Sequence, residues 1–219
     1  MLTALIFDSG YGGEFFADRL TAEIPVIDVI RIIDWHHADQ YLGGARQSRK
    51  LAEDAIRPYI GRVDVIVFAN HLLTATSLKY FRRKYPNQKF IGLSLKAPDT
   101  FIKRDVAIIT TKALSKTMGY HGFIYHLKRR VKTIVVDTWP IKIDEGELTY
   151  QEIANTISEF FTKKNIHPQE IILANSQLED IKPALKKLLG QNIKIYSSFD
   201  DAIREIVKTL RIRGGLKKK

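Results

Sequence analysis

The sequence predicts an α/β protein, and two observations carry that prediction. Short apolar runs recur along the chain, and each ends in small or polar residues that an amphipathic stretch of helical length follows. The runs are nearly continuous in Val, Ile and Leu rather than alternating with polar residues, which is typical of strands buried on both faces of a parallel sheet. Strands and helices that alternate in this way indicate α/β architecture.

Eight apolar runs are expected to form strands. They cover residues 2–7, 26–33, 63–68, 90–93, 106–109, 133–136, 171–173 and 193–196. Apolar residues at helical spacing predict helices between several of these runs, at 43–59, 72–85 and 113–127. A further helix is expected to begin near Glu14, after the first strand.

Two more helix starts carry capping-box patterns. Thr149 with Glu152 precedes an apolar-periodic stretch, and Ser198 with Asp201 precedes the last helix. In that last helix the apolar residues share one face, so its basic residues fall on the opposite, solvated side. This helix could return to pack on the first half of the chain.

The chain divides most readily at residues 95–99, where Pro98 ends a strand-like run and a new series of strands begins. We therefore expect a first α/β domain at 1–96, joined by the C-terminal helix at about 199–212, and a second at 97–198. The basic tail, 213–219, is expected to be disordered because it has no apolar anchor beyond Leu216.

The charge of the chain is unevenly distributed. There are 35 Lys and Arg against 24 Asp and Glu, a formal net charge of +11. Residues 204–219 hold seven of the basic side chains and one acidic, which is +6, so the remainder carries 28 against 23, which is only +5. A basic surface attracts polyanions, so a nucleic-acid or acidic partner stays an alternative, although most of this charge belongs to the last helix and tail.

The first apolar run stops at Phe7 and no basic segment precedes it, so it reads neither as a signal peptide nor as a membrane span. We expect a cytoplasmic protein with no membrane partner. The chain contains no cysteine. This excludes disulfide frameworks, cysteine-ligated zinc, iron–sulfur clusters and any mechanism that uses a thiol.

Candidate site residues follow the strands, because ligands of parallel α/β sheets bind beyond the carboxyl ends of the strands. Four such segments consist of small or hydrogen-bonding residues: Asp8-Ser9-Gly10-Tyr11-Gly12-Gly13, Ala69-Asn70-His71, Thr110-Thr111 and Ala174-Asn175-Ser176-Gln177. The glycine-rich turn could present free backbone N–H groups to a carboxylate or phosphate. It is not a dinucleotide fingerprint, because Phe15 occupies the third glycine position. The alternative is a tight turn in which Asp8 caps the helix.

The other polar clusters are less specific. His36 and His37 with Asp39 could suggest a metal, but a solvated loop is favoured, so no metal site is expected. His71 lies at a strand end, where ligands bind, so it is the histidine that we consider for a functional role. The basic segments 79–84 and 128–132 are read as solvated faces, although aromatic residues interleave the first as a nucleic-acid surface would require.

The order of these motifs resembles glutamate racemase, of the aspartate/glutamate racemase superfamily. The resemblance rests on the Asp8-to-Gly13 turn, Tyr41 with the following Gly43, Ala69-Asn70-His71, Ile91-Gly92-Leu93, Thr110-Thr111-Lys112-Ala113-Leu114-Ser115 and Ala174-Asn175-Ser176-Gln177. It implies two α/β domains that face each other across a ligand cleft, and chemistry without a cofactor. It also implies these substrate-binding residues: Asp8, Ser9, Tyr41, Gly43, Asn70, His71, Thr110, Thr111, Ser176 and Gln177.

The family exchanges the α-proton of an amino acid between two cysteines, one on each face of the substrate. By the resemblance those cysteines belong at Ala69 and Asn175, and neither residue has a useful acid or base. The leading hypothesis is therefore a small amino or carboxylic acid bound without two-thiol racemisation. One alternative is an isomerase, lyase or hydrolase that uses His71 or Asp8 in place of thiols. Another is a binding protein for nucleic acid or an acidic partner; a homodimer is also considered.

Overall fold

The computed structural model describes residues 2–93, 95, 105–127, 131–190 and 192–212. Within these residues the chain divides into two compact units, 1–94 with 198–219, and 95–197. The expected basic tail, 213–219, and part of the basic segment 128–132 lie outside the described residues. The expected domain limits stay a prediction, because a division by contacts does not show which segments fold independently.

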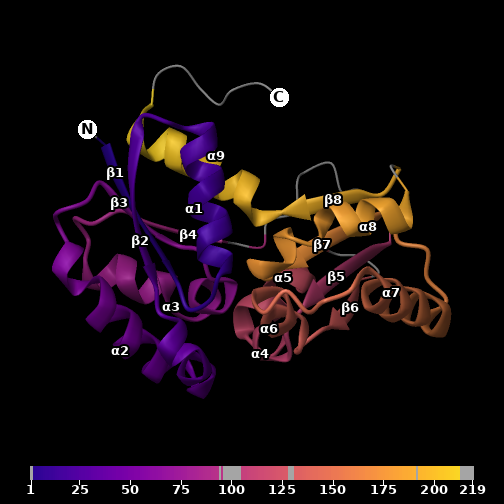
Figure 1. Ribbon diagram of the computed structural model, residues 1–219. Coiled ribbons are helices and arrows are strands. Elements are labelled where there is room, and N and C mark those ends of the chain that lie inside the picture. The colour runs from indigo at the N-terminus through magenta and orange to yellow at the C-terminus, as the bar shows by residue number, and fades with distance from the viewer. Residues whose placement is uncertain (1, 94, 96–104, 128–130, 191, 213–219) are drawn as a thin grey trace. The chain divides into compact units, whose positions relative to one another are not determined.

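The first unit contains a four-stranded parallel sheet in the order β2-β1-β3-β4 (Figure 1). Its strands are β1 (Leu2–Asp8), β2 (Ile27–Ile33), β3 (Val65–Phe68) and β4 (Phe90–Gly92). Its helical segments are α1 (Gly12–Glu23), η1 (Trp35–Gly43), α2 (Ala45–Ile56), η2 (Arg57–Tyr59), α3 (His71–Lys84) and α9 (Ser198–Leu210). The chain thus returns to this unit for its last described helix.

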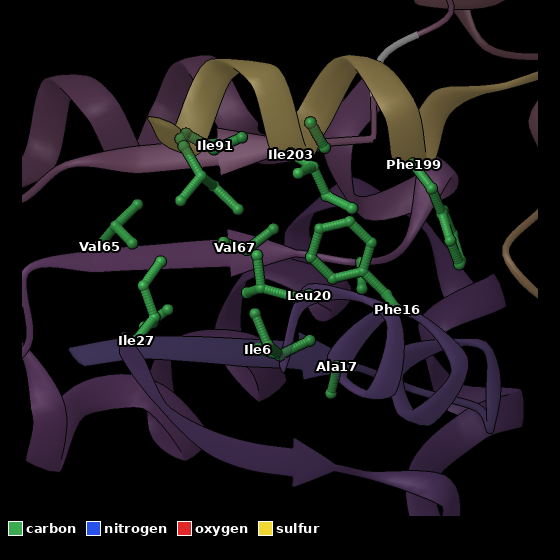
Figure 2. Close-up of a cluster of buried hydrophobic side chains, with 14 of the residues drawn as sticks. Ile6, Phe16, Ala17, Leu20, Ile27, Val65, Val67, Ile91, Phe199 and Ile203 are labelled. Carbon is green, nitrogen blue, oxygen red and sulfur yellow. The ribbon is translucent and has the colours of Figure 1, made fainter. Parts of the chain in front are cut away.

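Alternating residues of β1 and β3 point to opposite faces of this sheet, as the geometry of a strand requires. Ala4, Ile6, Val65 and Val67 pack with residues of α1 and α9, whereas the intervening residues pack with η1, α2 and α3. Figure 2 shows the first of these clusters. In it the rings of Phe16 and Phe199 pack edge to face, with their centres 5.0 Å apart. Both faces of the sheet are therefore covered at β1 and β3, which explains why these two strands are almost wholly apolar.

The second unit repeats the same strand arrangement, in the order β6-β5-β7-β8. Its strands are β5 (Val106–Thr110), β6 (Val131–Val135), β7 (Glu170–Ala174) and β8 (Lys194–Ser197). Its helical segments are α4 (Lys112–Ser115), α5 (Met118–Leu127), α6 (Trp139–Asp144), α7 (Tyr150–Lys164), η3 (Gln177–Glu179) and α8 (Lys182–Leu189). Both four-stranded parallel sheets with flanking helices agree with the predicted fold class.

Three local expectations need correction. The helix expected at 113–127 is two helices, because the Thr117 hydroxyl accepts from the Tyr120 amide at 3.1 Å and starts a new helix. The helix expected at 43–59 is confined to α2, since Gly44 has a φ of +107°, which a helix does not accept. The expected cap at Ser198 is wrong: α9 already includes Ser198, whose hydroxyl pairs with His71 instead.

The expected cap at Thr149 is confirmed, because its hydroxyl accepts from the Glu152 amide at 3.2 Å.

No helix of the described residues is both long enough and apolar enough to span a bilayer.

Candidate functional site

The first polar cluster lies where β1 and β3 end. These strands are neighbours in the sheet, so Asp8 at the end of β1 comes beside Asn70, which follows β3. The Asn70 amide donates to Asp8 Oδ1 at 2.8 Å and to Ser9 Oγ at 3.0 Å. Its own carbonyl oxygen accepts from the Leu73 amide at 2.8 Å and caps α3. Asn70 is thereby locked in one orientation, as a binding group requires.

The glycine-rich turn brings α1 against the same cluster. A Cβ on Gly13 would lie 2.6 Å from the Asp8 Cβ and 2.6 Å from a methyl group of Ile33, so only glycine fits there. Asp8 is 1% exposed and accepts the Ser9 amide at 2.7 Å. The N-cap residue of α1 is Tyr11, whose side chain makes no capping hydrogen bond, and the alternative of Asp8 as a cap stays a prediction.

Asp34 extends the cluster from the end of β2. Its backbone amide donates to the Asp8 carbonyl at 2.9 Å, and its carboxylate accepts the Tyr41 hydroxyl at 2.7 Å. Burial raises the pKa of Tyr41, and the hydrogen bond to Asp34 and the charges of Asp34 and Asp8 raise it further. Tyr41 is therefore a neutral hydrogen-bond donor near neutral pH. Gly43 ends the same segment, η1, and is exposed.

The histidines of η1 do not gather around an ion. His37 Nδ1 lies 2.7 Å from Asp34 Oδ1, and the His36 ring stacks on Trp35 at 3.7 Å. Across the described ranges, no three His, Asp or Glu side chains come together as metal ligands. This part of η1 is an exposed surface segment.

Ala69 and His71, on either side of Asn70, are both buried. Ala69 is 0% exposed and belongs to the apolar cluster that also holds Phe199 and Ile203. His71 is 5% exposed; its Nε2 pairs with the Ser198 hydroxyl at 2.8 Å, while Nδ1 has no partner among the described atoms. Burial lowers the pKa of His71 to about 3, so its ring is neutral near neutral pH.

The second unit carries its own polar cluster at the ends of β5 and β7. The Thr110 hydroxyl is buried and donates to the Ala174 carbonyl at 3.4 Å. Thr111 caps α4 through the Leu114 amide at 3.5 Å, and Asn175 accepts the Gln177 amide at 2.9 Å. These strand-end residues are thus held by local hydrogen bonds.

Two further hydrogen bonds link Ser176, Gln177 and Asp144 in this second cluster. The Ser176 hydroxyl donates to Gln177 Oε1 at 3.3 Å, and Gln177 Nε2 donates to Asp144 Oδ2 at 3.3 Å. Asp144 comes from the end of α6 and brings a carboxylate to the ends of the strands. The structure therefore brings Asp8, Ser9 and Asn70 together in the first unit and Ser176 and Gln177 together in the second. Gly43 is instead exposed, and His71 pairs with Ser198.

Sequence reasoning missed three residues of these clusters. Asp34 follows a predicted strand, so the criterion that selected Asp8 could have found it. Asp144 lies at the end of a short helix, and Ser198 is 127 residues from its partner His71. No spacing rule points to either of these two.

The aromatic residues within 79–84 are not a free stacking surface. Phe81 is buried, and the Tyr80 ring lies 5.0 Å from the Arg49 guanidinium and 5.6 Å from the Lys84 ammonium. Arg82 donates to the Phe90 carbonyl at 2.6 Å. These contacts agree with a helix whose aromatic side packs against the rest of the unit. Binding to nucleic acid or to an acidic partner, and the formation of a homodimer, stay predictions.

Comparison with known proteins gives one consistent answer. No family model matches the chain. It is 22% identical over 213 residues to a glutamate racemase of Dinoroseobacter shibae, covering 88% of this chain and 78% of that protein. To a glutamate racemase of Bacillus cereus it is 21% identical over 212 residues, covering 92% and 77%.

Solved structures show the same relationship in three dimensions. The structure of Escherichia coli glutamate racemase in complex with L-glutamate and the activator UDP-MurNAc-ala superposes with a TM-score of 0.80 at 16% identity, covering 99% of this chain and 85% of that one. An aspartate racemase homologue from Pyrococcus horikoshii gives a TM-score of 0.61 at 15% identity, covering 96% and 99%.

The fold is accordingly that of the aspartate/glutamate racemase superfamily. Within it, the predicted resemblance to glutamate racemase is confirmed by both sequence and structure.

Proposed function

We propose that this glutamate racemase-like protein binds a small amino or carboxylic acid and does not racemise it by a two-thiol mechanism. One observation carries the proposal. A chain with the fold of a glutamate racemase contains no cysteine, yet it keeps an ordered polar cluster of Asp8, Ser9 and Asn70 at the ends of its strands.

The cluster has the chemistry that an amino acid needs. The Asp8 carboxylate supplies negative charge for an ammonium group, and Asn70 and Ser9 supply neutral hydrogen-bonding groups beside it. Such groups, held before the ligand arrives, lower the entropy lost on binding.

The chemistry of proton exchange is missing from the same positions. A general base contributes typically about 10²- to 10⁴-fold to a rate, and a racemase needs one on each face of the substrate. The methyl group of Ala69 has no ionisable proton and is packed in an apolar cluster. The Asn175 amide is no base either, and it is already engaged with the Gln177 backbone.

His71 is a weak replacement for a thiol. A ring with a pKa of about 3 has little tendency to take a proton from a carbon acid near neutral pH. Its Nε2 is also engaged by the Ser198 hydroxyl. The buried environment of His71 therefore favours a binding protein over the alternative of an isomerase, lyase or hydrolase.

Calorimetry with D- and L-glutamate, D- and L-aspartate and related diacids tests the binding. We expect saturable heat for at least one of these ligands. Ser9→Ala should weaken binding because it removes the hydroxyl beside Asn70 without creating a cavity in the core. Asn155→Ala, which removes an exposed amide on α7, is the matched control and should bind normally. No heat at millimolar ligand would refute the binding proposal.

Exchange in deuterated solvent tests the missing chemistry separately. Proton NMR of each amino acid, incubated with the protein, should show an undiminished α-proton signal. Loss of that signal at a rate proportional to protein concentration, and abolished by His71→Gln, would instead establish the isomerase alternative.

A further inference from the structure

A groove on the first unit concentrates positive charge from side chains that do not belong to the polar cluster of Asp8, Ser9 and Asn70. It is open to solvent, lies between α2 and α3 and has a volume of about 410 Å³. Three of its cations come from α2: Arg46, Arg49 and Lys50. They share one face of that helix, because residues three and four apart in a helix lie side by side. None of these three side chains forms an ion pair within the described residues.

The other charges of the groove are already neutralised. Lys84 donates to Glu53 at 2.6 Å, and Arg57 donates to Asp54 at 2.6 Å. These two pairs lie toward the C-terminal half of α2, so the excess positive charge is confined to its first turns. A short, multiply charged anion suits such a patch better than an extended polyanion does.

Arg49 contacts α3 from across the groove. Its guanidinium lies 5.0 Å from the centre of the Tyr80 ring, a cation–π distance, and one terminal nitrogen donates to the Thr76 carbonyl at 2.5 Å. The Nε atom is buried and has no hydrogen-bond partner in the described structure. An N–H group that is withdrawn from water without a partner costs free energy.

We propose that the α2–α3 groove binds the phosphate group of a small phosphorylated molecule. Three unpaired cations exceed what a single carboxylate would neutralise, whereas a phosphate monoester or diphosphate carries about two negative charges or more. The planar arginine fork matches phosphate oxygens, and Lys50 adds a mobile point charge. The volume falls within the range of about 300–1,000 Å³ that is usual for small-molecule sites.

Titration calorimetry of the full chain with pyrophosphate at low ionic strength tests this proposal. We expect one saturable site. Arg49→Gln should weaken it by about tenfold or more, because a charge-assisted hydrogen bond is lost. Arg46→Gln combined with Lys50→Gln should do the same at two exposed positions, which keeps the test valid if Arg49→Gln disturbs folding. Arg83→Gln, an exposed cation of α3 that does not line the groove, is the matched control and should bind as the native chain does.

Two results would overturn the proposal. One is the absence of saturable binding at millimolar pyrophosphate. The other is an oligothymidylate that binds more tightly than pyrophosphate or ADP and loses as much affinity with Arg83→Gln as with Arg49→Gln. That pattern would indicate diffuse attraction to the basic surface. Displacement of pyrophosphate by ADP, with the groove variants weakened and Arg83→Gln unchanged, supports the groove as a phosphate site.

Discussion

The buried His71 makes folding stability depend on pH in a predictable direction. Its pKa falls from 6.5 in an unfolded chain to about 3 in the fold, because burial disfavours the charged ring. Between these values the unfolded chain binds a proton that the folded chain does not. The free energy of unfolding therefore has its full His71 contribution above about pH 6.5 and loses it as the pH falls toward about 3.

The size of this effect follows from the same pKa values. Within the window, one extra proton on the unfolded chain changes the free energy of unfolding by about 1.4 kcal/mol per pH unit. Between about pH 8 and about pH 5 the loss is therefore about 2 kcal/mol, since little titration occurs above the unfolded value. His71→Gln, which keeps a polar group for Ser198 but cannot titrate, should remove this loss.

Urea unfolding at the two pH values, followed by tryptophan fluorescence, measures the effect, because Trp35 lies in the same unit as His71. The native chain should lose about 2 kcal/mol more of its free energy of unfolding than His71→Gln does between about pH 8 and about pH 5. Other titrating groups are the same in both proteins, so their contributions cancel in this difference. His126→Gln removes an exposed histidine and shows what such a replacement does by itself. If the difference stays the same at both pH values, His71 titrates alike in the folded and unfolded chains, and the reasoning from burial is wrong.

Three substitutions test the packing that positions the site. Gly13→Ala should destabilise by about 1–3 kcal/mol in urea unfolding, because its new methyl group would lie 2.6 Å from two neighbouring side chains; Gly122→Ala, in open space, is its control. Phe199→Ala should cost about 3–5 kcal/mol by removing a ring that packs on Phe16, and an unchanged midpoint would show that α9 does not hold this unit together. Thr149→Ala should cost about 1 kcal/mol, measured by thermal unfolding, whereas Thr149→Ser should retain the cap.

The strands were predictable because a strand that is buried on both faces of a sheet consists almost entirely of apolar residues. A strand such as β3, Val-Ile-Val-Phe, faces helices on both sides and can carry no polar residue. The polar residues at its end were predictable because ligands of parallel α/β sheets bind beyond the carboxyl ends of the strands. Asp8 and Asn70 therefore stand out in the sequence and are bonded to each other in the structure.

The details that sequence reasoning missed depend on partners far away in the chain or on single hydrogen bonds. The break between α4 and α5 depends on the Thr117 hydroxyl, which interrupts a pattern that otherwise continues as one helix. The role of Ser198 depends on His71, to which no local periodicity connects it. The order of strands likewise follows from pairing between distant segments, which apolar patterning alone does not specify.

The triplet 69–71 divides its contacts between the returning helix α9 and the polar cluster at the strand ends. Ala69 packs in the apolar cluster that includes residues of α9, and His71 holds the first residue of α9 by a hydrogen bond. Asn70, between them, instead engages Asp8 and Ser9. Two of the three residues thus stabilise the returning helix, and one maintains the polar cluster. Because a buried methyl group serves packing better than an ionisable thiolate would, stability and proton transfer make opposing demands at position 69, where this chain has alanine.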